Sequence, residues 1–146
     1  MAYGRRMSEG LSLPATPTQA GTVKVAAAPP SGVPVAADRM VGNTEVLLSS
    51  TSPTTVVAFT PQATGWYEVL IYFRVVTAAT AVTISISYSD PSGAQTNTVL
   101  NNATMSVNSY SMNPIPIYAA TSSSISVQFT AGTANHVYAS ALIYAR

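Results

Sequence analysis

The chain has 146 residues, of which 47% are hydrophobic and 8% charged, with a formal net charge of +1 and no cysteine. This length fits one domain with a tail. The charge balance gives no electrostatic reason to expect nucleic acid or an anionic membrane as a partner. Without cysteine, disulfides and thiolate chemistry are excluded.

The second half of the chain is almost uncharged: between Val75 and Ala145 the one charged residue is Asp90. Serine and threonine, which number 36 in the whole chain, supply the polar positions instead. An average soluble domain is about a quarter charged, and charge normally keeps sheet edges from pairing with neighbouring molecules. We therefore expect a surface that other protein covers, as in a building block of an assembly rather than a freely diffusing catalyst.

Residues 1–43 differ in composition from the rest and contain five of the ten prolines and five of the eight glycines. They show neither the period of a strand nor that of a helix, so we expect an extended segment with polyproline II character. Two interpretations are open: a linker, or an arm that lies along a neighbouring subunit.

Targeting signals are weak. Arg5 and Arg6 resemble a twin-arginine start, but Glu9, Pro14 and Lys24 follow where a signal peptide has an apolar run. No segment approaches the ~20 apolar residues of a transmembrane helix. The sequence predicts a protein made in the cytoplasm without a signal peptide.

From residue 44 onward, predicted strands follow one another with turn residues between them. Apolar and polar residues alternate, as in Ile84-Ser85-Ile86, which indicates one buried and one polar face. No helix of useful length is predicted. The expected strands cover residues 45–48, 54–59, 66–76, 81–88, 96–100, 105–111, 115–118, 124–129 and 136–144.

Two local signals separate these strands. Residues 90–93, with the sequence Asp-Pro-Ser-Gly, predict a turn, because proline presets φ and glycine accepts φ > 0. Pro114 and Pro116 restrict their segment to an edge strand or a connection.

The strands at 66–76 and 136–144 are apolar on both faces. A sandwich strand needs only one buried face, so a second, tyrosine-rich face predicts a partner, and a sister subunit is the obvious one. In the first strand, one face carries Tyr67, Val69, Ile71, Phe73 and Val75, and the other carries Trp66, Leu70 and Tyr72 with Glu68 and Arg74.

We predict an all-β, jelly-roll-like antiparallel β-sandwich over residues 44–146, preceded by an extended N-terminal arm.

Glu68 and Arg74 are six residues apart on one strand, about 20 Å, and cannot touch each other. Either they pair across subunits or with Arg146, or each lies at an exposed rim, where an ion pair contributes under about 1 kcal/mol.

Three stretches carry a family resemblance. One resembles the F-x5-G-x-Y-x-F-x-F/Y signature of the complement globular-head and tumour necrosis factor superfamily: Phe59, then five residues, then Gly65-Trp66-Tyr67-Glu68-Val69-Leu70-Ile71. Residues 140–144 are similar to that family's final strand, and residues 126–132 to its strand and turn of pattern L-x-A-G-D. The sequence departs from the family at Thr133, where an acidic residue is expected.

The resemblance implies a ten-stranded jelly roll that forms a tight trimer, with aromatic residues of the Gly-x-Tyr strand and of the last strand near the three-fold axis. The chain also resembles small virion proteins of tailed bacteriophages, in which a β-sandwich follows an extended N-terminal arm. Such proteins serve as capsid decoration (cement) trimers or as fibre and tail tips, and fold alone does not fix function.

Residues suited to catalysis or metal binding are scarce. A catalyst needs a base or nucleophile tuned by its neighbours, and a zinc site needs three or four protein or water ligands. The chain has one histidine, His136, and its carboxylates are Glu9, Asp38, Glu45, Glu68 and Asp90. We predict no enzyme, no catalytic residue, no cofactor and no metal, and we interpret His136 as a strand-end histidine.

The resulting prediction is a non-enzymatic virion structural protein, a homotrimeric capsid decoration protein at the capsid surface. Its expected partners are further copies of itself and the major capsid protein or another virion protein, with neither nucleic acid nor membrane. The residues predicted at the oligomer interface are Trp66, Tyr67, Tyr72, Tyr138, Leu142 and Tyr144. Those predicted for docking of the arm are Arg5, Arg6, Leu11, Leu13, Pro14 and Pro17.

The alternative prediction is the receptor-binding tip of a phage tail or fibre. In that case exposed loops around residues 90–93, 101–102 and 131–135 would hold a host glycan or protein. The tyrosines and Trp66 could then stack on a sugar, although such residues more often fill cores and subunit interfaces.

Overall fold

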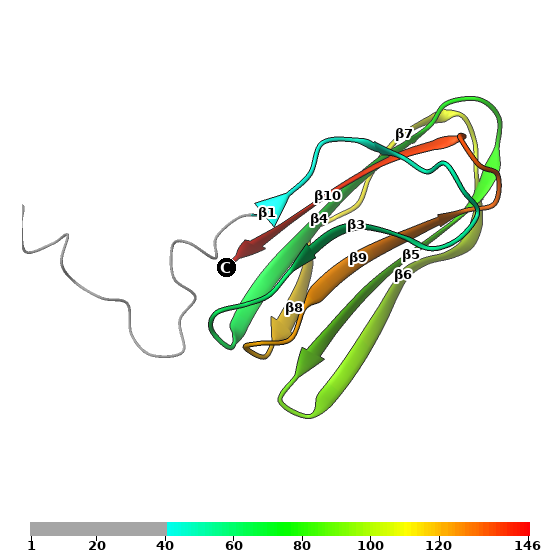
Figure 1. The fold of residues 1–146 in the computed structure, drawn as a ribbon. Coiled ribbons are helices and arrows are strands. Elements are labelled where there is room, and N and C mark those ends of the chain that lie inside the picture. Colours follow the sequence, from blue (N-terminus) through cyan, green and yellow to red (C-terminus); the bar gives the residue numbers. More distant parts are fainter. Residues whose placement is uncertain (1–40) are drawn as a thin grey trace, which may run out of the picture. The chain divides into compact units, whose positions relative to one another are not determined.

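The structure, a computed structural model, describes residues 41–146. This part of the chain contains ten strands and no helix, which confirms the predicted all-β class (Figure 1). The predicted arm, apart from its last three residues, lies outside the described residues. The strands are β1 (Val41–Gly42), β2 (Val46–Leu47), β3 (Thr54–Phe59), β4 (Gly65–Val75), β5 (Thr80–Asp90), β6 (Gly93–Met105), β7 (Asn108–Ser111), β8 (Ile115–Ala119), β9 (Ile125–Ala131) and β10 (Val137–Ala145).

Two antiparallel sheets form the sandwich. In sheet A, β10 and β4 lie side by side at the centre, β1 and β2 both pair with β10, and β7 and β8 both pair with β4. Sheet B has the order β3-β9-β5-β6. If β1 with β2, and β7 with β8, are taken as two interrupted strands, each sheet has four strands. This is the eight-strand, two-sheet arrangement of a jelly roll.

The core lies between the two sheets and is built by strict alternation along the central strands. In β4, every second residue from Tyr67 to Val75 is buried, as the sequence predicts. Alternation places successive side chains on opposite faces, so one row of apolar residues from each central strand is buried between the sheets. Phe73 of sheet A meets Phe129 of sheet B with their ring centroids 6.0 Å apart. This aromatic contact joins the two sheets across the core.

Three predicted strand boundaries are wrong. Residues 41 and 42, expected in the arm, form β1 against β10. The strand expected at 96–100 extends over 93–105, because its ladder with β5 continues through Asn and Thr residues. That ladder shifts register twice near Ile84, and Asn102, with φ of 47°, is held by its N–H donating to Thr83 Oγ1 at 2.9 Å. The strand expected at 105–111 is interrupted between Met105 and Asn108.

The turn and edge predictions are confirmed. Asp90 pairs with Gly93 across a two-residue hairpin loop, and Gly93 has φ of 131°. The Asp90 carboxylate accepts hydrogen bonds from the Ser92 N–H (2.8 Å) and hydroxyl (2.6 Å). Pro116, which has no N–H to donate, lies in β8 opposite Glu68 at an edge of sheet A.

Candidate assembly face

The outward faces of the two sheets differ in chemistry. On the central strands of sheet B, β5 and β9, the outward side chains are Ala81, Thr83, Ser85, Ser87, Ser126, Gln128 and Thr130. On the central strands of sheet A, β4 and β10, they are Trp66, Glu68, Leu70, Tyr72, Arg74, Tyr138, Ser140, Leu142 and Tyr144. We call this second set the β4–β10 face. Hydroxyl groups suit a face in contact with water, whereas leucine and aromatic side chains in a row do not.

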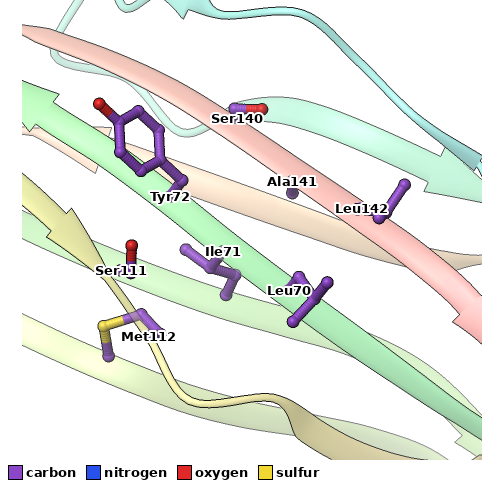
Figure 2. A pocket seen from close by; sticks show the side chains of 8 residues that line it. All are labelled: Leu70, Ile71, Tyr72, Ser111, Met112, Ser140, Ala141 and Leu142. Atoms are coloured by element: carbon purple, nitrogen blue, oxygen red, sulfur yellow. The ribbon is translucent and has the colours of Figure 1, made fainter.

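The centre of the β4–β10 face is apolar. Leu70 lies opposite Leu142 in the ladder, and Tyr72 lies opposite Ser140. Together with Met112, which follows β7, these residues border an open groove of about 270 Å³ (Figure 2). The remaining lining residues are Ile71, Ser111 and Ala141. Among residues 41–146, no carboxylate and no basic side chain lines the groove.

One end of the face carries a paired arginine. Arg74 donates from Nε and Nη2 to the two carboxylate oxygens of Glu45, at 2.7 and 2.9 Å. The guanidinium also lies 4.4 Å from the ring centroid of Tyr138, a cation–π contact. The hydrogen bond from Arg74 holds the pKa of the Glu45 carboxyl below its usual range. The charge at this end is therefore neutralised within the chain.

The other end carries a paired glutamate. Glu68 Oε2 accepts a hydrogen bond from the Tyr144 hydroxyl. Glu68 Oε1 forms an ion pair with Arg146 Nε, 3.1 Å away. The hydrogen bond to Glu68 raises the pKa of the Tyr144 phenol above its ordinary value. Beside this cluster, the rings of Trp66 and Tyr118 meet edge to face at 5.3 Å. Of the two pairings expected for Glu68, the one with Arg146 is present within the chain.

Five of the six residues predicted at the oligomer interface lie on the β4–β10 face: Trp66, Tyr72, Tyr138, Leu142 and Tyr144. Whether they form an interface remains a prediction. Tyr67 is a correction, because it is fully buried in the core on the opposite side of β4. Its hydroxyl donates to the Ala63 carbonyl at 2.9 Å and its ring contacts Phe59. A side chain held there cannot contact another subunit.

Sequence reasoning missed part of this surface. Leu70 alternates with buried residues and could have been chosen from the pattern alone. Met112 follows β7 in a connection without a period, so no sequence signal places it beside β4. Tyr118, which is 39% exposed, depends on the pairing of β8 with β4 for its contact with Trp66. The residues predicted for arm docking, from Arg5 to Pro17, lie outside the described residues.

The three loops of the alternative prediction do not converge. Val82, at the start of β5, pairs with Ala131 and with Ala103, so residues 101–102 and 131–135 gather at one end of sheet B. Residues 90–93 form the hairpin tip at the other end of β5 (Figure 1). A ligand site that uses all three loops is therefore not formed.

The described residues offer little reactive chemistry. His136 Nδ1 lies 3.3 Å from the Ala78 carbonyl oxygen, just before β10 begins. Within residues 41–146, no three His, Cys, Asp or Glu side chains are grouped as metal ligands would be. In the same residues no helix is long and apolar enough to cross a membrane.

Known proteins resemble the chain in fold only. No protein-family model and no curated protein sequence matches it. Similar solved structures include the infectious bursal disease virus VP2 subviral particle, with 13% identity and a TM-score of 0.48 over 75% of this chain and 30% of that one. The structure of the Gx strain of that virus gives 13% identity and a TM-score of 0.46 over 75% and 30%. Its T13 viral particle gives 13% and 0.47 over 75% and 32%.

The chain thus spans about a third of the length of these viral chains. At TM-scores below 0.5, the likeness says nothing about what this chain does.

Proposed function

We propose that the chain is a structural virion protein that associates with copies of itself through the β4–β10 face. The observation that carries the proposal is the contrast between the two outward faces. Sheet B presents hydroxyl groups, as a solvated sheet does, whereas sheet A presents Leu70, Leu142 and four aromatic side chains. A monomer gains nothing from a second apolar face on its central strands. Tyrosine, tryptophan and arginine are the residues in which protein interfaces are enriched.

The electrostatics of the face support the same proposal. Arg74 and Glu68 are each paired within the chain, to Glu45 and to Arg146. Covering a charge that lacks a partner is strongly unfavourable, and here a second copy would cover pairs that already exist. The edge of sheet A formed by β7 and β8 is interrupted and carries Pro116, which discourages strand pairing at that edge. At this side of sheet A, association by the face is therefore favoured over association by the edge.

The finer role that we propose is a homotrimeric capsid decoration protein at the surface of the particle. The near absence of charge between Val75 and Ala145 and the resemblance to small bacteriophage virion proteins support it. Whatever binds only the assembled lattice stabilises that lattice by mass action. Three arms linked through one trimer would add avidity. The arm residues that we propose for docking, on a neighbouring subunit or on the capsid shell, are Arg5, Arg6, Leu11, Leu13, Pro14 and Pro17.

Trp66, the single tryptophan of the chain, provides a direct test of the covered face. Its side chain is 51% exposed in one copy. If copies associate through the β4–β10 face, acrylamide will quench Trp66 weakly in concentrated protein. Dilution below the dissociation constant will shift its emission to longer wavelength and strengthen the quenching. The control Ser85→Asp, on the outward face of sheet B, should behave like the unmodified chain. Strong quenching that is independent of concentration would contradict the proposal.

A receptor-binding tip is the second candidate, favoured by the exposed pair of Trp66 and Tyr118. Deleting residues 1–40, which leaves all ten strands, separates the two roles. A decoration protein should lose its binding to particles after this deletion, because the arm provides part of the docking. A tip protein should keep its ligand, because the aromatic pair remains.

A further inference from the structure

A groove interrupts the β4–β10 face, so a second copy that covers this face must place atoms in the groove or leave a void there. The groove has a volume of about 270 Å³ and is bordered by Leu70, Tyr72, Met112 and Leu142 (Figure 2). Well-packed protein interiors leave few voids larger than a water molecule. A well-packed interface across this face therefore needs an occupant for the groove, and an extended segment of chain is narrow enough to enter it.

The chain contains a segment with the matching chemistry. Residues 10–23 carry no charge, and Leu11 and Leu13 are separated by one residue. In the β conformation, which the residue before a proline can adopt, side chains two residues apart point to the same side, about 6.6 Å apart. Both leucines can therefore enter the groove together. Pro14, which follows them, has no N–H that would need a partner, and the hydroxyls of Ser111 and Tyr72 at the groove can bond to main-chain groups.

The course of β1 favours a groove on another copy. Gly42 pairs with Leu142 and Val41 with Ile143, so the step from Gly42 to Val41 leads along β10 away from the groove, whose lining ends at Leu142. Thirty residues separate Leu11 from Val41, a length that spans up to about 100 Å when extended. A groove on an adjacent subunit is within this reach. In a closed ring each subunit would give one arm and receive one.

We propose that Leu11 and Leu13 of one copy occupy the β4–β10 groove of a neighbouring copy. This inference rests on the proposed function, because it requires a self-associated protein. It adds the occupant of the groove and the role of the arm residues. In this arrangement, the sandwich of one copy covers the rim of the groove on its neighbour, and an arm fills the groove itself.

Cross-linking tests the proposal in the full chain, which has no cysteine of its own. One chain carries Ser12→Cys, and a second, tagged chain carries Ser111→Cys beside the groove. The matched control places the second thiol at Ser126→Cys, on the outward face of sheet B. The two chains are co-expressed and treated with a short bismaleimide. We expect mixed dimers with Ser111→Cys, in roughly tenfold excess over those with Ser126→Cys because the arm is held locally.

Adding Leu11→Asp and Leu13→Asp to the Ser12→Cys chain should remove the excess, because carboxylates would enter an uncharged groove. Equal yields at positions 111 and 126, or an excess that survives both substitutions, would overturn the proposal. So would cross-links that form only within a chain carrying both thiols, since the arm would then occupy its own groove. Light-scattering mass of the same samples separates the two claims. An oligomer without the cross-linking excess would contradict the arm in the groove but leave self-association through the β4–β10 face standing. A monomer would contradict both proposals.

Discussion

Asp90 shows how a single carboxylate organises the longest hairpin of the sandwich. Its Oδ1 accepts hydrogen bonds from the N–H and hydroxyl of Ser92 and lies 3.3 Å from Gln95 Nε2. These bonds, chiefly that of the Ser92 hydroxyl, lower the pKa of Asp90. The Asp-Pro-Ser-Gly pattern predicted the turn, because proline and glycine set its backbone angles. The bond to Gln95 depends on the hairpin ladder and could not be predicted from the turn residues.

The lowered pKa of Asp90 makes the hairpin sensitive to acid. A carboxyl with a folded pKa below its unfolded value of about 3.9 stabilises the fold above that value and loses this contribution as the pH falls through the folded pKa. NMR of amide exchange at Ser92 gives the local stability of the hairpin once the intrinsic exchange rate at each pH is taken into account. This local stability should therefore be constant above about pH 5 and fall, relative to that of other amides, below about pH 4. Asp90→Asn should remove most of that acid dependence. An identical acid response in both proteins would contradict this role.

At the scale of the element, each central strand contributes one row to the core and one row to an outer surface. β9 shows this clearly, with Phe129 fully buried and Thr130 partly exposed on the opposite side. The predicted alternation of β4, β5, β9 and β10 is confirmed for this reason, since a period of two is a local property. The length of β6 and the existence of β1 were not predicted. Both contain polar residues or glycine and lack an apolar pattern, and they are extended because β5 and β10 offer them backbone hydrogen-bond partners.

The two rows of β9 should respond very differently to truncation. Phe129→Ala is expected to lower the free energy of unfolding by about 3–5 kcal/mol, because it leaves a cavity against Phe73 between the sheets. Thr130→Ala, the matched control on the outward face, should change it by no more than about 0.5 kcal/mol. Urea denaturation followed by circular dichroism measures both values. Similar losses for the two variants would show that the sandwich core is placed incorrectly.

At the scale of the whole molecule, the two outward faces distinguish a hydroxyl-rich side from the apolar side that we propose is covered by a second copy. The sequence alone indicated the two strands of the proposed contact, because both are apolar on two faces, and it predicted five residues of the β4–β10 face. It wrongly included Tyr67, because an aromatic residue next to Trp66 on one strand lies on the opposite face. The groove was not predicted, because Leu70, Leu142 and Met112 meet only after three strands and a connection are assembled. The pairing of Arg74 with Glu45 likewise joins residues 29 apart in sequence.

Light-scattering mass of the full chain, compared between Leu142→Asp and Ser85→Asp, tests self-association through the β4–β10 face most directly. The unmodified chain and Ser85→Asp should give the mass of a trimer of the 15.1 kDa chain. Leu142→Asp should be lighter while its circular dichroism remains that of a folded sandwich, because a carboxylate covered without a partner costs several kcal/mol. An unmodified chain with the mass of one copy, or an unchanged mass for folded Leu142→Asp, would contradict the assignment of this face.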